Sequence, residues 1–374
     1  MRKRITFSLV IIFFISLILY QGCGKKEETD IIKIGAVLPL TGSLSFMGEL
    51  ERHGMEIARE TLERDNISLF YEDSEGNATK GLNAAQNLLN INNVKILITT
   101  GTAVSRSVSS LHNRFSFLQS AFCMDPSIQE EDENVLRLYY GMEQEAKTIL
   151  SYLKEINQRS NNLSSNAVGI LSVNHQGSIQ QVNDYFKPGL KELGIPIQFI
   201  DTYEFSQKDF KNIIAKISNT GIRKLIIIGY GFVYPEIFKN LEQYNLLKEI
   251  DIIGGWGFIA NKNLTDNQLE GIVVASPLCM ISPNDKYKAF EKKYLEKYKV
   301  RPNFESALAY ENVLLFYDAF NNVKEHKDLE KIRSYILGLE YDSILGEIKI
   351  TEKGKMVIPM GLGKFVKGKL KPLY

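Results

Sequence analysis

The sequence has few of the cysteines that stabilise small proteins through disulfides, and it has almost no net charge. Its 374 residues include three cysteines and one tryptophan, and the formal net charge is only +1. Cys123 and Cys279 could pair in an oxidising compartment, but two cysteines give no disulfide framework. The charges are spread along the chain, which excludes the basic stripe of a nucleic-acid-binding protein. The length is sufficient for two domains with full cores.

Short catalytic motifs are also missing. The sequence contains no G-x-S-x-G elbow, no H-E-x-x-H helix and no C-x-x-C pair. His175 has no clustered partner among the other three histidines, so no metal site is predicted. We therefore expect neither a cofactor nor an enzymatic activity.

The N-terminal segment has the pattern of an export signal. Three basic residues at 2–4 precede the uncharged, mostly apolar run Ile5–Tyr20, which is typical of a signal peptide and short for a spanning helix. Cys23 follows directly and resembles the lipidated cysteine of a bacterial lipobox. We expect residues 1–22 to be a signal peptide and 23–30 a lipid-anchored linker of an extracytoplasmic lipoprotein. An ordinary signal peptide, or an uncleaved anchor with a bystander cysteine, is the alternative.

Beyond this segment, short apolar strands alternate with amphipathic helices, and no second apolar run approaches the length of a spanning helix. This alternation predicts an α/β fold with parallel sheets. The predicted strands are Ile31–Leu38, Ile67–Tyr71, Val94–Ile98, Ala167–Val173, Ile197–Tyr203, Lys224–Ile228, Ile250–Ile253 and Gly271–Ala275. The predicted helices between them are Gly48–Arg64, Thr79–Asn90, Glu143–Gln158, Ile179–Leu193, Phe210–Asn219 and Pro235–Leu246.

The C-terminal third changes character. Two long helices, Asp285–Tyr298 and Phe304–Val323, interrupt the alternation. The tail after them reads as strand, turn, strand, turn, strand, with Lys353-Gly354 and Lys367-Gly368 at the turns. We expect this tail to form an antiparallel appendix to one of the sheets.

Several local motifs follow one another in an order that resembles a known family. They are IKIGAVLPLTGSLSFMGELERHGMEIARETL, FYEDSEGNATKGLNAAQNLL, VKILITTGTAVSRSVSS, IIIGYGFVYPEIFKNLEQYNL and ALAYENVLLFYDAF. In this order they resemble the type I periplasmic binding proteins, specifically the branched-chain amino-acid (Leu/Ile/Val) receptors. No single motif is diagnostic; the order is what is specific.

The resemblance implies two lobes, each a mostly parallel sheet flanked by helices, that close on one ligand by a hinge motion. It also implies a monomer that hands its small-molecule ligand to an ABC permease in the membrane. The three interlobe crossovers would lie near 141–143, 274–279 and 340–344. The first lobe would comprise 31–141 and 277–341, and the second 142–276 and 342–374.

In open parallel sheets, ligands bind beyond the carboxyl ends of the strands, and this rule selects the candidate site. Thr100, Thr102 and Ala103 follow the third strand and open a helix, where free N–H groups favour an anion. Simple N-capping by Thr102 is the alternative. In amino-acid receptors of the resembled family, a serine of this loop holds the ligand carboxylate, and it falls at Thr102 or Ala103.

The same rule selects five further candidates, and the resemblance suggests their roles. Cys123 or Met124 stands where the family has a threonine that contacts the ligand, and neither side chain replaces that hydroxyl's donor and acceptor; core packing is the alternative. Gln176 follows the first strand of the second lobe, where the family often carries an aromatic residue. Tyr230 and Phe232 lie in a loop whose tyrosines line the cleft in amino-acid receptors.

The only tryptophan lies between glycines, in Gly254-Gly255-Trp256-Gly257. The stretch formally matches a dinucleotide fingerprint, but it comes late in the chain and lacks the acidic residue about 20 positions further on. In the resembled family this turn carries the acidic residue that pairs with the ligand's α-ammonium. Tryptophan instead offers apolar area, one N–H donor and a π face.

A standard α-amino-acid pocket is therefore not expected. Trp256, Tyr230, Phe232 and Met47 suit an apolar or aromatic ligand with an anionic end at Thr102; a quaternary ammonium in an aromatic cage is the alternative. The expected function is a lipid-anchored solute-binding protein of an ABC importer. A non-transport ligand-sensing or regulatory protein with the same fold is the second possibility.

Overall fold

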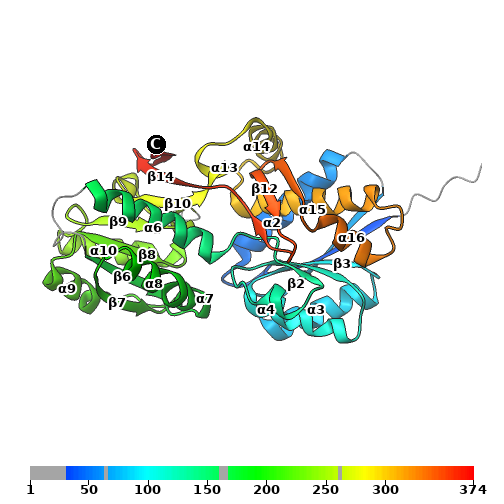
Figure 1. Ribbon diagram of the computed structural model, residues 1–374, viewed down its shortest axis with the longest axis horizontal. Helices are drawn as coiled ribbons and strands as arrows, with labels where there is room; N and C mark the ends of the chain where they lie inside the picture. Colours follow the sequence, from blue (N-terminus) through cyan, green and yellow to red (C-terminus); the bar gives the residue numbers. More distant parts are fainter. Residues whose placement is uncertain (1–30, 63–65, 160–166, 260–262) are drawn as a thin grey trace, which may run out of the picture.

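The computed structural model describes residues 31–62, 66–159, 167–259 and 263–374. The predicted signal peptide and linker, with Cys23, lie outside these residues. The described chain forms two lobes side by side, each built on a mostly parallel sheet with helices on its faces (Figure 1), which confirms the predicted fold class. Within this part of the chain, no helix combines the length and apolarity needed to cross a membrane.

The first lobe contains a five-stranded parallel sheet in the order β2-β1-β3-β4-β5. Alternate side chains reach opposite faces of a strand, so Ile34 and Ile98 pack against the helices of one face, whereas Val37 and Leu97 pack against those of the other. The strands are β1 Ile32–Leu38, β2 Ile67–Asp73, β3 Ile96–Thr100, β4 Leu118–Phe122 and β5 Val135–Leu136. The helices α3 Ala78–Asn90 and α4 Thr102–Ser109 cover the face of Val37.

The other face carries the long helices of the lobe. Their bounds are α2 Ser45–Leu62, α14 Asp285–Tyr298, α15 Phe304–Asn322 and α16 Leu329–Ile336. α2 and α15 cross so closely that a Cβ added to Gly54 would lie 2.0 Å from the carbonyl oxygen of Ser306. Glycine therefore fixes the distance between the two helices, and both bring side chains to the carboxyl end of the sheet.

The second lobe contains a seven-stranded sheet in the order β15-β14-β10-β9-β8-β6-β7. Its strand β14 runs antiparallel to both of its neighbours, β10 and β15. The strands are β6 Val168–Val173, β7 Ile197–Tyr203, β8 Lys224–Ile228, β9 Asp251–Gly254, β10 Val273–Pro277, β14 Met360–Val366 and β15 Lys369–Pro372. One face packs on α6 Met142–Arg159 and on the consecutive segments α7 Gln176–Gln181, a π turn Val182–Phe186 and α8 Lys187–Glu192. The opposite face packs on α9 Lys211–Thr220 and α10 Tyr234–Gln243.

The C-terminal tail is divided between the lobes, which corrects the prediction that it forms one appendix. The strands β11 Glu340–Ser343, β12 Gly346–Ile350 and β13 Met356–Val357 form a separate antiparallel sheet. Ile348, Ile350 and Met356 belong to the core of the first lobe, so the third crossover follows β13 and does not lie at 340–344. Most of the region 342–357 thus belongs to the first lobe and not, as predicted, to the second. The apolar side chains of β12 and β13 share one buried cluster with those of α15 and α16, an association of distant segments that no local sequence pattern predicts.

Candidate ligand-binding site

A cavity lies between the two lobes at the carboxyl ends of both sheets. In the first lobe it is bordered by the residues after β1 and β3, and in the second by those after β6, β8 and β9. β1 lies between β2 and β3 in the first sheet, and β6 lies between β7 and β8 in the second, so the strand order reverses at β1 and at β6. Such switch points are where open α/β sheets bind ligands, because the connecting loops diverge there.

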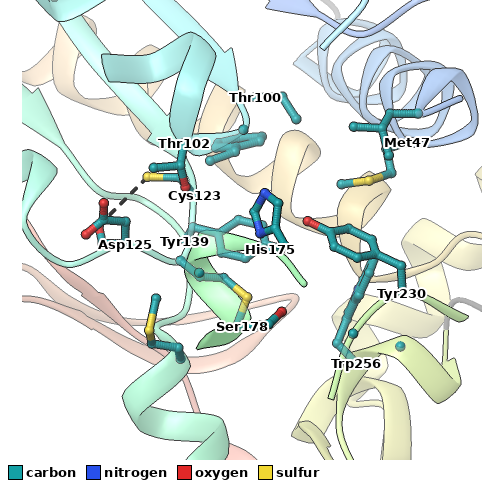
Figure 2. A pocket seen from close by; sticks show the side chains of 18 of the residues that line it. Met47, Thr100, Thr102, Cys123, Asp125, Tyr139, His175, Ser178, Tyr230 and Trp256 are labelled. Carbon is teal, nitrogen blue, oxygen red and sulfur yellow. Dashed lines mark hydrogen bonds between the residues drawn. The ribbon is translucent and has the colours of Figure 1, made fainter. Parts of the chain in front are cut away.

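Eight of the ten predicted ligand-binding residues line this cavity (Figure 2). They are Met47, Thr100, Thr102, Ala103, Cys123, Met124, Tyr230 and Trp256. In Figure 2 the Tyr230 hydroxyl points toward the middle of the cavity, with Met47 on one side of it and Trp256 on the other. The strand-end rule and the resemblance therefore selected residues that the fold brings together.

Gln176 and Phe232 do not line the cavity. Gln176 faces a shallow groove at the rim, which it shares with Arg106 and Asp125, because the first turn of α7 turns its neighbours His175, Gly177 and Ser178 inward instead. Phe232 lies in the 3₁₀ turn Gly231–Val233, remains 39% exposed and stacks on Phe205 with ring centroids 5.7 Å apart. Strand-end reasoning identified the loops but not the side of a turn on which each side chain falls.

The first-lobe wall is formed by the turn between β3 and α4. The N-cap residue of α4 is Gly101, at φ 90°, and it makes no side-chain cap. Thr102 is the first residue of the helix and therefore does not act as the predicted N-cap. The neighbouring Thr100 hydroxyl is buried and donates a hydrogen bond of 2.7 Å to Glu51 Oε2.

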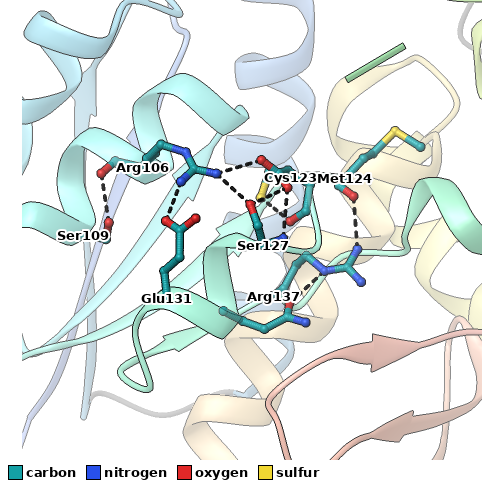
Figure 3. A network of polar contacts seen from close by, with 9 residues as sticks. Arg106, Ser109, Cys123, Met124, Ser127, Glu131 and Arg137 are labelled. Carbon is teal, nitrogen blue, oxygen red and sulfur yellow. Dashed lines mark hydrogen bonds and ion pairs between the residues drawn. The ribbon is translucent and has the colours of Figure 1, made fainter. Parts of the chain in front are cut away.

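Two arginines form polar contacts with the loop after β4 (Figure 3). Arg106 pairs with Asp125 at 2.9 Å, and the fully buried Arg137 donates to the carbonyl oxygen of Met124 at 3.4 Å. Cys123 is buried, and burial raises the pKa of its thiol to about 12, so it is a protonated, weakly polar side chain at neutral pH. Cys123 and Cys279 are both free.

The turn that carries Trp256 is fixed by a buried carboxylate. The backbone N–H of Trp256 donates to Glu145 Oε2 at 2.9 Å, and Gln181 donates to Glu145 Oε1 at 3.0 Å. Trp256 is 9% exposed, and its indole ring stands perpendicular to the ring of Tyr230, with centroids 5.9 Å apart. Two aromatic faces therefore meet at a right angle at the second-lobe wall, a favourable arrangement of ring quadrupoles.

The glycines around Trp256 are explained by close approach and not by backbone dihedral angles, since none of the three has a positive φ. An added Cβ would lie 2.3 Å from the Phe258 ring at Gly254, 2.0 Å from the Glu145 carboxylate at Gly255, and 2.2 Å from the Gly229 carbonyl oxygen at Gly257. The tryptophan is thus presented from a turn with no room for neighbouring side chains.

We expect Gly257→Ala to lower the free energy of unfolding by about 1–3 kcal/mol, the usual cost of forcing extra atoms into a packed region. The added methyl group would meet a backbone carbonyl that cannot rotate away. Urea unfolding followed by circular dichroism measures the effect. Gly177→Ala is the control, because a Cβ there meets no atom closer than 3.7 Å. Equal stability of the two variants would contradict this explanation of the turn.

Buried carboxyl groups are the main feature of the site that the sequence prediction missed. Glu51 on α2 and Glu145 on α6 line the cavity, and Glu305 on α15 lies beside it, within hydrogen-bonding distance of Tyr139, whose hydroxyl donates to Glu305 Oε1 at 2.8 Å. Glu51 follows the buried Gly48 and precedes the buried Met55 at helical spacing. A charged residue on the apolar stripe of an amphipathic helix is the signal that could have found it.

Burial, more than any neighbour, sets the protonation of these groups. It raises the pKa of Glu305 to about 7. Burial and, next to it, the charge of Glu305 raise the pKa of Glu51 well above its usual range. His175, which also lines the cavity, has a pKa lowered by burial and is neutral at pH 7.

Comparison with known proteins gives one consistent result. A family model described as periplasmic binding protein matches residues 31–369. The Leu/Ile/Val-binding protein homolog 2 of Brucella abortus (strain 2308) is 21% identical over 346 residues, covering 88% of this chain and 89% of the relative.

Two solved structures have the same fold. One is the branched-chain amino acid transporter substrate binding protein of Streptococcus pneumoniae in complex with isoleucine, with a TM-score of 0.77, 17% identity, and coverage of 91% of this chain and 98% of that one. The other is a solute binding protein of an ABC transporter from Rhodopseudomonas palustris BisB5 in complex with 3,4-dihydroxybenzoic acid, with a TM-score of 0.79, 16% identity, and coverage of 91% and 95%. At these identities the likeness shows the fold.

Proposed function

The chain belongs to the periplasmic binding proteins, in the type I group of the branched-chain amino-acid receptors, and from that premise we propose that it captures a small solute in the interlobe cavity and delivers it to an ABC importer. It is a binding protein and not an enzyme. The observation that carries the proposal is the cavity itself, which takes residues from the switch points of both sheets. A solute that contacts both walls stabilises the closed arrangement of the lobes.

The ligand we propose is a small, largely apolar or aromatic molecule and not a standard α-amino acid. Met47, Tyr230 and Trp256 supply an apolar and aromatic lining. Glu145, the carboxylate nearest the Trp256 turn, already accepts hydrogen bonds on both oxygens from the protein. The position of the expected hydroxyl donor is occupied by a protonated thiol or a thioether. Titration with leucine and isoleucine is expected to give no saturable binding.

The experiment that tests the proposal is a ligand screen followed by small-angle X-ray scattering. Residues 31–374 would be screened against a metabolite library by thermal shift, and each hit titrated while the radius of gyration is measured. We expect at least one hit to reduce the radius of gyration as the lobes close. A library-wide absence of ligands that close the lobes would overturn the proposal.

We further propose that Cys23 anchors the protein to the membrane as a lipoprotein. The basic residues 2–4, the apolar run Ile5–Tyr20 and the cysteine at its end support this. In a bacterial host labelled with a palmitate analogue, we expect the wild-type chain to incorporate label and to fractionate with membranes. Cys23→Ser should lose the label and be released or retained as an unprocessed precursor. Label incorporation that persists in Cys23→Ser would contradict the assignment, and Cys279→Ser serves as the matched control.

A further inference from the structure

The cavity carries an imbalance of charge. Among the described residues that line it there are three carboxyl groups, Glu51, Asp125 and Glu145, and no lysine or arginine. The charge of Asp125 is met by Arg106, and Glu145 accepts two N–H groups. Glu51 is different, because only its Oε2 has a hydrogen-bond partner.

The hydrogen bonding of the Glu305 carboxyl group is similar to that of Glu51. Glu305 Oε1 accepts the Tyr139 hydroxyl, whereas its Oε2 makes no well-formed hydrogen bond in the described chain, although the Trp256 side chain is close enough to lower the pKa of this carboxyl group. Both side chains are fully buried, with 0% exposure. A buried carboxyl oxygen that lacks a donor costs free energy unless a proton or another donor reaches it. Glu51 lines the cavity, whereas Glu305 lies beside it, outside the lining. The unpartnered oxygen of Glu51 therefore points to a ligand that brings a donor.

Aromatic rings complete the surroundings. Tyr139 and Trp256 line the cavity next to the carboxyl pair, and Tyr230 stands perpendicular to Trp256 (Figure 2). Aromatic faces attract cations, and buried carboxylates accept hydrogen bonds from ammonium groups. A carboxylate ligand would find no lysine or arginine on these walls. This argues against the anionic end of the ligand that the sequence places at Thr102.

From this arrangement we infer that the ligand is a protonated amine with an apolar body, whose ammonium group donates to Glu51, with Glu305 as the neighbouring carboxyl group, and lies against the rings of Tyr139 and Trp256. The inference rests on the proposed function, since it names the ligand class of the same cavity. The apolar body would contact Met47 and Tyr230, which also line the cavity.

Amine binding would be coupled to proton release. Without ligand, the Glu51–Glu305 pair holds at least one proton at neutral pH, because burial raises the pKa of both groups. The titratable groups that face the pair are Tyr139, Tyr140 and Tyr230, and none of them is a cation. An alkylamine stays protonated up to about pH 10, as lysine does. Its ammonium charge would replace the proton, which leaves to solvent, so amine affinity should rise as the pH increases through about 7.

The test uses probes that share one body and differ at one end: 2-phenylethylamine, 2-phenylethanol and 3-phenylpropionate, with matching sets built on 3-methylbutyl and hexyl chains. Binding would be measured by isothermal titration calorimetry at pH 5.5 and 8 in buffers of different ionisation enthalpy. We expect at least one amine to bind about tenfold tighter than its alcohol, with no binding of the carboxylate. We also expect that amine to bind tighter at pH 8 and to release a proton.

Glu51→Gln should weaken that amine by about tenfold or more, and Glu305→Gln, which removes the carboxyl group next to Glu51, by a smaller factor. Glu311→Gln is the matched control, because Glu311 is a buried glutamate of α15 whose partner is the Ile344 N–H, and it neither lines the cavity nor is among the charges that shift the pKa of Glu51. Its amine affinity should stay unchanged. If either site variant fails to fold, the pH dependence and proton release of the wild-type protein decide instead.

Tighter binding of an alcohol or carboxylate than of its amine, or unchanged amine binding in the folded Glu51→Gln and Glu305→Gln variants, would overturn the inference. Failure of every amine while other metabolites close the lobes would overturn it too, but would leave the proposed solute-binding function standing. Only the failure of all compound classes to close the lobes would remove the proposed function itself.

Discussion

Arg137→Met is expected to lower the free energy of unfolding by about 3 kcal/mol, the cost of breaking a buried ion pair from one side. Arg137 is fully buried where the chain leaves β5 for the second lobe. Its guanidinium donates to Gln129 at 2.8 Å and to Glu143 at 2.9 Å. Burial alone would raise the pKa of Glu143, but the charges of Arg137 and Lys355 hold it below its usual value. Methionine fills the volume but leaves these acceptors with fewer donors.

The matched comparison is Arg106→Met. Arg106 contacts the same loop, through Asp125 and Ser127, but its side chain is 40% exposed, and exposed ion pairs contribute about 1 kcal/mol or less. Urea unfolding of both variants measures the difference. A loss for Arg137→Met no larger than that for Arg106→Met would contradict the view that Arg137 anchors the first crossover.

The free protein is expected to lose stability as the pH rises from 5 to 8. Burial raises the pKa of both Glu305 and Glu311 from 4.5 to about 7. The folded state therefore holds protons that the unfolded chain has already released. Each group's contribution is complete below about pH 4.5 and is lost as the pH rises to about 7, a change of about 3 kcal/mol for a shift of this size.

Other groups do not cancel this trend. Asp73 and Asp125 have lowered pKa values, so their contributions are constant above pH 5 and disappear only in acid. His53 and His175 also have lowered pKa values, mainly because of burial, and they add stability as the pH rises through about 6.5. Their opposing effect is the same in every glutamate variant.

Glu311→Gln isolates the effect. A neutral amide can still accept from the Ile344 N–H, which reaches Glu311 Oε2 at 3.4 Å. The difference in unfolding free energy between pH 5 and pH 8 should shrink by about 3 kcal/mol relative to the wild-type protein. Urea unfolding at four pH values between 5 and 8 gives this difference. Parallel pH profiles for the variant and the wild type would show that Glu311 is ionised in the folded protein.

The sequence predicts most of the fold because its information is local. The helical pattern located α14 at its observed bounds, and the apolar runs located β7 and β8 likewise. β4, Leu118–Phe122, was not predicted as a strand, since Gln119 and Ser120 interrupt its apolar run and the interior accommodates them by hydrogen bonds to Ser105 and Asn312. Burial of polar side chains is decided by partners that are distant in the sequence.

The candidate site was also predicted only as far as local sequence information reaches. The loops at strand ends follow from strand order, so eight of the ten candidate residues lie at the cavity. Phe232 and Gln176 do not line the cavity because a single turn decides which neighbour faces inward. The carboxyl groups of Glu51 and Glu305 were missed because they come from helices α2 and α15, whose crossing at Gly54 brings them to the cavity from outside the strand-end loops.

The measurement that tests the central claim most directly is the fluorescence of Trp256 during ligand titration. Trp256 is the only tryptophan in the chain, and its ring lies at the wall of the interlobe cavity. For any ligand whose binding is established by calorimetry, we expect the Trp256 emission to be quenched or shifted with the same dissociation constant. A ligand that binds and closes the lobes while the Trp256 emission stays unchanged would place the binding site elsewhere and contradict the account.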